Sequence, residues 1–188
     1  MEVVGRAKHK LAGALEAFRL DLRNKVVIDI GSSTGGFTEL ALRLGAKKVI
    51  AIEKGTNQMK APLRFDERIE LHEKTDIFDF KCETAPDVVV ADVSFVSLTE
   101  VLRYVRDNIA DEHTEFAVML KPQFEAKQWQ LRRGVIKNNK MRREIIADFE
   151  ATIKRDGFVI INKRDNELAG RFGNVERFYH LRKAKDGR

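Results

Sequence analysis

The sequence predicts one α/β domain over residues 1–188, in which helices cover both faces of a seven-stranded, mostly parallel sheet. Apolar runs of strand length alternate with stretches of helical period, and no repeat, low-complexity tract or Pro/Gly/Ser linker interrupts them. The 188 residues, 43% of them hydrophobic, are enough for one domain with a full core. Crossovers long enough to hold a helix join parallel strands, so we expect a doubly wound sheet.

The first half of the chain is expected to begin with a basic helix over residues 1–20 that packs on the core. Apolar residues at helical spacing in KLAGALEAF indicate this helix. In order, we then expect strand KVVIDIG running into a glycine turn, helix GGFTELALRLG closed by Gly45, strand KKVIAIE, a short helix QMKAPLRF and strand RIELH.

The second half continues the same alternation. In order, we expect strand PDVVVADV, helix LTEVLRYVRDNI, strand EFAVML, a loop, the long helix MRREIIADFEATIKRDG, and strands FVIINK and VERFYHLRK. The last two strands have no helix between them. We therefore expect one of them to be antiparallel to the rest of the sheet.

The net charge of +6 lies mainly in the C-terminal part of the chain. Residues 121–188 hold 18 Lys+Arg against 9 Asp+Glu, whereas residues 1–120 hold 17 against 20. A basic surface suits a polyanionic partner such as RNA, because neutralised phosphates release counterions. An ordinary lysine surplus on a soluble surface is the alternative interpretation.

Several classes of protein are not indicated. No run approaches the roughly 18 apolar residues of a membrane span, and MEVVGRAKHK lacks a signal-peptide core, so we expect a cytoplasmic protein without a membrane partner. Cys82 is the only cysteine, and the four histidines show no metal-ligand spacing. We therefore expect neither a disulfide nor a metal site.

Polar residues close the predicted strands, where open α/β sheets bind their ligands. The first strand ends in DIGSSTGGFT, and the next four end in or lead to Glu53, Asp76, Asp92 and Lys121. A single acid at a strand end would be unremarkable. Lys121 directly after a buried apolar strand either escapes to solvent or sits in a site.

The glycine turn favours a nucleotide-type ligand that has no pyrophosphate. Ser32 and Ser33 break the G-x-G-x-x-G pattern of dinucleotide sites after Gly31. The alternative is S-adenosyl-L-methionine, whose cationic sulfonium calls for acids rather than a phosphate cradle. Gly35 and Gly36 would then allow close approach of the main chain.

The acids at the strand ends can be matched to parts of this cofactor. Asp29 can orient the methionine end, Glu53 can accept both ribose hydroxyls, and Asp76 can accept from the adenine amino group. Glu53 lies 24 residues after Asp29, close to the usual spacing of a ribose acid of roughly 20. The alternative is that the glycines serve a tight turn and the acids cap helices or solvate strand ends.

Five motifs together resemble the FtsJ-like methyltransferases, and more closely the TlyA-type ribosomal RNA methyltransferases, a group also called haemolysins. They are DIGSSTGGFT, the acid ending KKVIAIE, ADVSFVSL, LKPQFE and GNVERFYHL, in this order over nearly the whole chain. The opening GRAKHKLAGALEAF also resembles that family, with Gly5 where serine is usual.

The resemblance implies a Rossmann-like class I fold and S-adenosylmethionine-dependent methylation of a ribose hydroxyl, with cytidine in ribosomal RNA expected. Its catalytic tetrad falls on Lys10, Asp92, Lys121 and Glu176. Lys121 would be the base or an orienting hydrogen-bond donor, Asp92 its partner, and the other two orienting groups. The implied cofactor-binding residues are Asp29, Gly31, Ser33, Thr34, Gly35, Gly36, Phe37, Thr38, Glu53, Asp76 and Asp92.

RNA contacts are expected in the cation-rich segment 126–143. A base could stack on Trp129 while Arg132 and Arg133 meet the backbone, and Arg6 and Lys8 could form a second edge of the groove. A solvated helix face with one core tryptophan is the alternative interpretation.

The family usually carries an N-terminal S4-like RNA-binding module, and we expect it to be absent here. Either the sequence is a catalytic fragment of a longer protein, or the module was lost. Ribosomal RNA or ribosomal subunits are the expected partners, and the oligomeric state stays open. A small-molecule methyltransferase and a noncatalytic cofactor- or RNA-binding module are the competing functions. Pore formation would need a spanning or amphipathic membrane segment, and no spanning segment is evident.

Overall fold

A seven-stranded sheet forms the centre of the molecule, with strands in the order β3-β2-β1-β4-β5-β9-β8. The computed structural model describes residues 3–166 and 173–184, with the side chains of residues 3–7 outside that description. The strands are β1 (Val26–Ile30), β2 (Lys48–Glu53), β3 (Ile69–Glu73), β4 (Val88–Ala91), β5 (Glu115–Leu120), β8 (Phe158–Asp165) and β9 (Arg177–Lys183). Among the described strands of this sheet, β9 alone runs opposite to the others, so the expected fold class and its one antiparallel strand are confirmed.

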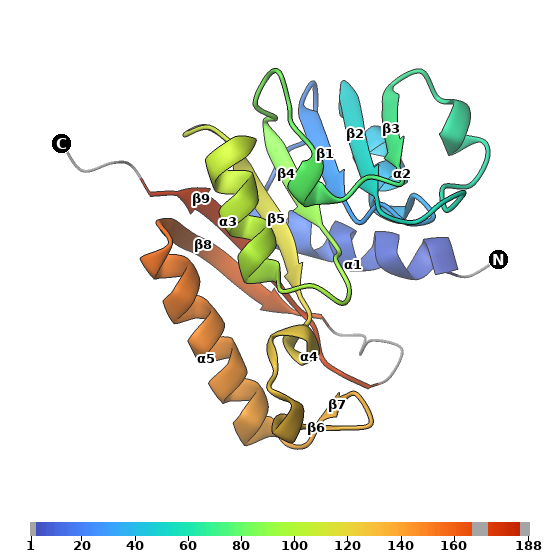
Figure 1. Ribbon diagram of the computed structural model, residues 1–188. Helices are drawn as coiled ribbons and strands as arrows, with labels where there is room; N and C mark the ends of the chain where they lie inside the picture. The colour runs from blue at the N-terminus through green and yellow to red at the C-terminus, as the bar shows by residue number, and fades with distance from the viewer. Residues whose placement is uncertain (1–2, 167–172, 185–188) are drawn as a thin grey trace.

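Helices cover both faces of the sheet (Figure 1). Helices α1 (Val3–Phe18) and α2 (Gly36–Arg43) pack on one face, and α3 (Leu98–Asn108) and α5 (Asn139–Arg155) pack on the other. Successive strand residues alternate between these layers, because a strand points its side chains to opposite faces in turn. Val27 packs with α1 and α2, whereas Ile28 packs with α3 and α5.

The central strands are buried on both faces, which explains why they read as continuous apolar runs. All four residues of β4 and five of the six residues of β5 are buried. Strand order reverses between β1 and β4, whose carboxyl ends lie side by side. Such a reversal is where doubly wound sheets bind ligands.

The C-terminal strand β9 inserts between β5 and β8 rather than adding to the edge of the sheet. Its antiparallel pairing with β5 ends at Leu120 opposite Arg177. One residue further, Lys121 follows β5 and Glu176 precedes β9. The register therefore places these two residues at adjacent strand ends.

The helix expected over QMKAPLRF is wrong, because only the 3₁₀ turn η1 (Leu63–Phe65) forms there. Pro62 has no backbone N–H and disfavours helical geometry at the preceding residue. The backbone N–H groups of Gln58 and Met59 donate instead to the Glu73 carboxylate. These bonds hold the segment in an irregular course.

The segment expected as a loop between β5 and α5 contains short elements of its own. They are α4 (Pro122–Glu125), the 3₁₀ turn η3 (Gln128–Gln130), and the hairpin strands β6 (Leu131–Arg132) and β7 (Val135–Ile136). Strands of two residues are too short to show alternation in a sequence. Figure 1 shows this hairpin projecting beyond α4, beside the start of α5.

Within the described residues, no helix has both the length and the apolar character needed to cross a membrane. The same residues contain no group of three or more His, Cys, Asp or Glu side chains placed to hold a metal ion.

Candidate active site

A cavity of about 590 Å³ opens at the carboxyl ends of β1, β2 and β4. Its polar lining includes the predicted residues Gly31, Ser33, Glu53, Asp76 and Asp92. Apolar side chains that follow β3 and β4 complete the walls, namely Ile77, Phe78, Val93, Phe95 and Val96. The cavity therefore combines an acidic rim with an apolar interior.

Gly31 allows the ends of β1 and β4 to meet at this cavity. Its φ of +77° lies in the left-handed region, and a Cβ there would come within 2.9 Å of the Asp92 carbonyl oxygen. Only glycine fits such a conformation and approach without strain.

Glu53 is held at the cavity rim by two backbone N–H groups. Ser33 N donates to Glu53 Oε2 at 2.9 Å, and Gly55 N donates to Glu53 Oε1 at 2.6 Å. Each carboxylate oxygen has a further lone pair that can accept another hydrogen bond. The side chain is therefore oriented in advance, as a ribose acid must be.

Asp76 caps the 3₁₀ turn η2 (Ile77–Asp79) and pairs with Lys54. Phe78 N donates to Asp76 Oδ1 at 3.2 Å, and Lys54 Nζ lies 2.7 Å from Asp76 Oδ2. The Lys54 ammonium lowers the pKa of Asp76, so this carboxyl group is ionised near neutral pH. An adenine amino group would have to share it with both partners.

Asp29 is fully buried and does not line the cavity, so its predicted action on the methionine end would pass through water or the backbone. Thr38 Oγ1 donates to Asp29 Oδ2 at 2.6 Å, while Asp29 Oδ1 has no hydrogen-bond partner. Burial raises the pKa of Asp29 to about 7, the Thr38 hydrogen bond opposes this, and the Asp92 charge adds to it.

The other expected cofactor residues of the glycine turn also lie outside the cavity lining. They are Thr34, Gly35, Gly36, Phe37 and Thr38. Phe37 and Thr38 are buried in α2, where Phe37 packs on Phe178. Gly35 has a φ of +95° and leaves room for Leu63, whose Cδ1 would lie 2.7 Å from an added Cβ. These residues build the turn rather than the cavity surface.

Lys121 and Asp92 form an ion pair at the ends of β5 and β4. Lys121 Nζ lies 2.6 Å from Asp92 Oδ1 and donates a hydrogen bond to Ser94 Oγ at 2.7 Å. The Lys121 side chain is only 13% exposed. The lysine after the apolar strand is therefore held in an ion pair rather than extended into solvent, and Pro122 begins α4 directly after it.

Lys10 and Glu176 form a second ion pair, between α1 and the residue before β9. Their side chains are 9% and 7% exposed, and Asn166 Nδ2 also donates to Glu176 Oε2 at 3.3 Å. Burying two charges costs desolvation free energy that their attraction can fail to repay, so this ion pair need not stabilise the fold. A functional role would explain why the pair is present. Because Lys121 and Glu176 lie at adjacent strand ends, one residue beyond the Leu120–Arg177 pairing, both ion pairs lie at the same edge of the sheet.

Phe95 is a site residue that the sequence did not single out. Its side chain is 92% exposed, its φ is +64°, and its ring centroid lies 5.1 Å from that of Phe124. A large aromatic side chain held in solvent at a left-handed position calls for a functional explanation. Its place three residues after Asp92, within ADVSFVSL, was the available signal.

The predicted RNA-binding residues are spread over several places. Arg132 and Arg133 are exposed on the β6–β7 hairpin, whereas Lys8 pairs with Glu39 at 3.4 Å. The side chain of Arg6 lies outside the described residues. Trp129 is 57% exposed and lines a separate cavity of about 380 Å³ with the acidic residues Glu144 and Asp148.

The donor set of the main cavity fits S-adenosylmethionine. Glu53, Asp76 and Asp92 supply carboxylates for hydroxyl and amino groups and for a cationic sulfonium, and the apolar walls suit an adenine ring. The lining cation Lys54 is already paired with Asp76. These residues suit a nucleoside with a positive charge better than a pyrophosphate.

Comparison with known proteins gives the family of this chain. The sequence profile described as FtsJ-like methyltransferase matches residues 3–183. The 23S rRNA (cytidine-2'-O)-methyltransferase TlyA of Campylobacter jejuni is 39% identical over 179 residues, which cover 94% of this chain and 70% of that protein. Hemolysin A of Brachyspira hyodysenteriae is 36% identical over 187 residues, covering 96% and 77% respectively.

Solved structures agree with this result. A hemolysin candidate from Streptococcus thermophilus superposes with a TM-score of 0.92 at 32% identity, over 99% of this chain and 69% of that one. An S-adenosylmethionine-dependent methyltransferase from Mesorhizobium loti, at 15% identity and a TM-score of 0.67, shows the same fold. This chain therefore belongs to the FtsJ-like methyltransferase family.

Proposed function

We propose that this protein transfers a methyl group from S-adenosylmethionine to the 2′-hydroxyl of a cytidine in ribosomal RNA. The observation that carries the proposal is the Lys121–Asp92 ion pair at the ends of β5 and β4, of which Asp92 also lines the main cavity. The reaction named for the Campylobacter jejuni relative supports the choice of nucleotide and atom.

The cavity residues divide the task of holding the cofactor. Glu53 would accept hydrogen bonds from the ribose hydroxyls, and Asp76 would accept one from the adenine amino group. Asp92 would face the positively charged sulfonium end. Ile77 and Phe78 would enclose the adenine ring. Bound S-adenosylmethionine supplies a methyl group on a positively charged sulfonium.

Lys121 would act on the ribose hydroxyl. A neutral Lys121 Nζ would accept the hydroxyl proton, whereas a charged one would donate a hydrogen bond and orient the oxygen for attack. Asp92 and Ser94 hold the Nζ atom in place for either role. Lys10 and Glu176 would orient the nucleotide from the other side, so that positioning supplies much of the rate.

The test is transfer of labelled methyl groups to ribosomal subunits that lack the modification, followed by nucleoside mass spectrometry. We expect 2′-O-methylcytidine as the product. Binding of S-adenosylmethionine without any transfer would refute the enzymatic proposal. A methyl group on a base, or on another ribose, would refute the assignment of the acceptor atom or nucleotide.

A further inference from the structure

The β6–β7 hairpin presents two arginines on an unusual turn. Leu131 pairs with Ile136 and Arg132 with Val135, which leaves Arg133 and Gly134 as the turn residues. Both have positive φ, 51° and 78°, as a type I′ turn requires. A glycine or asparagine would adopt the first position more readily than Arg133 does, so its exposed cationic side chain indicates a function.

A buried asparagine fastens this hairpin to the body of the protein. Asn174 Oδ1 accepts from Ile136 N at 3.1 Å, and Asn174 Nδ2 donates to Gly134 O at 3.0 Å. The Asn174 residue is 5% exposed. Since one amide side chain both donates and accepts, it holds the turn and the strand β7 at once.

The segment that contains Asn174 also carries the predicted catalytic acid. Glu176 pairs with Lys10, and the carbonyl oxygen of Val175 accepts from Arg142 Nε of α5 at 3.1 Å. Residue 174 therefore contacts the hairpin and residue 175 contacts α5. Residue 176 contacts the edge of the sheet that carries the predicted catalytic residues, called the catalytic edge below. Movement of the hairpin relative to Glu176 would have to break these contacts.

We propose that Asn174 is a positioning residue that fixes the Arg132–Arg133 hairpin relative to the catalytic edge. An RNA backbone bound by the two arginines would then present its ribose to Lys121 in a single register. The inference rests on the proposed RNA methylation, because it assigns the hairpin to that substrate. Small displacements of bound reactants cost large factors in rate, so a fixed hairpin has a clear chemical use.

Hydrogen exchange tests the attachment without any substrate. In Asn174→Ala, the amide of Ile136 should exchange about fivefold faster or more, as expected for loss of a buried hydrogen bond. The matched control is Asn162→Ala, which removes an exposed asparagine that donates to Ala17 O and accepts from Lys163 N but has no hydrogen bond to the hairpin. Unchanged protection of Ile136 in Asn174→Ala would overturn the proposal whatever the protein methylates.

A double-mutant cycle tests the function of the attachment. Arg132→Ala combined with Arg133→Ala should raise the KM for ribosomal subunits about tenfold or more in the wild-type background, and much less when Asn174→Ala is already present. The affinity for S-adenosylmethionine should stay unchanged throughout. Additive effects on KM would overturn the proposal.

A second variant keeps the test valid if Asn174→Ala folds poorly. Asn174→Asp retains the acceptor for Ile136 N but cannot donate to Gly134 O, so we expect KM between those of wild type and alanine. A KM equal to that of wild type would contradict the role of the second bond. Absence of methyl transfer by the wild-type protein would refute the proposed function, whereas hydrogen exchange would still decide the attachment.

Discussion

The ammonium group of Lys121 has two oxygen partners and little exposure to water, which suits a group that must meet one hydroxyl in a defined direction. We expect Lys121→Ala and Asp92→Ala each to lower methyl transfer by at least about 100-fold, the usual range for a positioned acid or base. The fold should be largely retained in both variants and cofactor affinity in Lys121→Ala, whereas Asp92→Ala also removes a carboxylate assigned to the cationic end of the cofactor. Labelled methyl transfer and calorimetric binding of S-adenosylmethionine measure the two effects.

The control for this pair is Lys163→Ala. Lys163 also makes an ion pair, with Glu150 at 2.8 Å, but its side chain is 46% exposed on β8. An exposed pair contributes little, so this variant should keep full activity. Near-normal turnover in either Lys121→Ala or Asp92→Ala would refute the assigned catalytic roles.

Phe95 offers a flat apolar surface at the cavity mouth, where a nucleobase of the substrate could stack. Base stacking on an aromatic side chain is worth roughly 1–3 kcal/mol, so Phe95→Ala should raise the KM for RNA by about tenfold. Phe65→Ala is the matched control, because Phe65 is 77% exposed on η1 and does not line the cavity. Equal effects of both substitutions on KM would argue against stacking.

The buried carboxyl group of Asp29 should make stability depend on pH. Its folded pKa of about 7 lies above its ordinary value of 3.8, so the folded state retains a proton that the unfolded state loses. The free energy of unfolding therefore falls as pH rises from about 4 to 7 and is then constant. The full shift would correspond to roughly 4 kcal/mol as an upper limit.

Asp29→Asn keeps the shape and the acceptor for Thr38 but does not titrate. We expect its free energy of unfolding to vary less between pH 4 and 7 than that of the wild type, measured by urea unfolding at several pH values. Identical pH profiles would show that Asp29 does not titrate in this window.

The side chain of one α4 residue, Glu125, caps the start of α3 and so joins the two helices. Glu125 of α4 accepts from Leu98 N at 2.6 Å and from Ser97 Oγ at 2.6 Å, at the start of α3. Burial raises the pKa of this carboxyl group. Ser97, the N-cap residue, makes no side-chain cap of its own, so Glu125 supplies the acceptor that the helix end needs.

Glu125→Ala should lower the free energy of unfolding by about 1–3 kcal/mol, because it leaves a buried donor without a partner. Glu100→Ala is the control, since Glu100 is exposed in the first turn of α3 and should contribute less than about 1 kcal/mol through the helix dipole. Chemical unfolding measures both. Equal losses would exclude a specific capping role for Glu125.

Across the entire chain, the charge asymmetry predicts how RNA affinity responds to salt. If Arg132 and Arg133 each neutralise a phosphate, replacing both with alanine should make the slope of log K against log salt less steep by about 1.5–2. The control replaces two exposed arginines, Arg19, which lies beside residues at the amino ends of β4 and β5, and Arg155, the last residue of α5. Titrations of ribosomal subunits at several salt concentrations give the slopes, and parallel slopes would contradict the predicted contacts.

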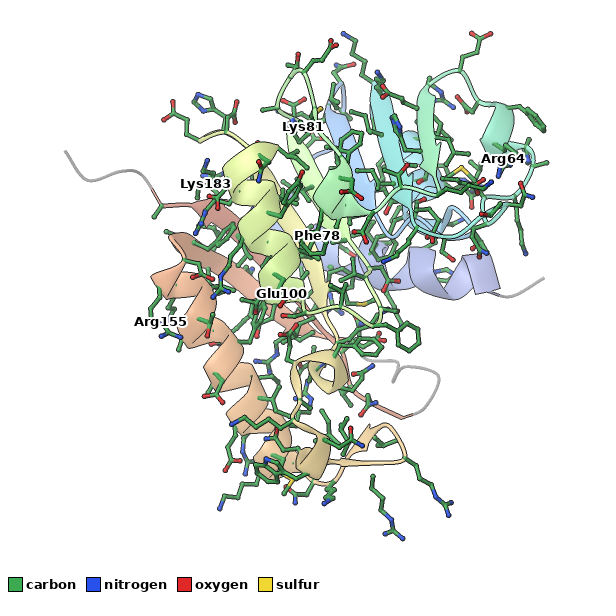
Figure 2. All side chains as sticks on the ribbon, viewed as in Figure 1. Arg64, Phe78, Lys81, Glu100, Arg155 and Lys183 are labelled. Carbon is green, nitrogen blue, oxygen red and sulfur yellow. The ribbon has the colours of Figure 1, made fainter. Side chains whose placement is uncertain are left out.

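Side chains that end in nitrogen and side chains that end in oxygen are interspersed over the molecule, as Figure 2 shows. The exposed arginines of the hairpin do not line the Trp129 cavity, whereas the acids Glu144 and Asp148 of α5 do. A phosphate backbone would therefore meet a favourable field at the hairpin and an unfavourable one beside Glu144 and Asp148. Net charge alone could not distinguish these two surfaces.

Local patterns in the sequence were sufficient for the sheet and most of its helices, whereas the catalytic candidates Lys10 and Glu176 came from the resemblance to the FtsJ-like methyltransferases. Buried parallel strands read as apolar runs, and the residues that close them, such as Glu53, Asp92 and Lys121, are fixed at one edge of the sheet by that reading alone. The same patterns gave no sign of β6 and β7, since two residues are too few for a period. They also suggested a helix before β3 that Pro62 and the Glu73 carboxylate prevent.

Contacts between distant segments were decided by the tertiary structure. Lys10 and Glu176 lie 166 residues apart and meet only because β9 inserts beside β5 and α1 packs across that face. Asp29 turned out to face Thr38 and the core rather than the cavity, and Asn174 to hold a hairpin 38 and 40 residues away. Local composition sets which element a residue joins, whereas the direction and partner of its side chain follow from the register and packing of elements that are remote in sequence.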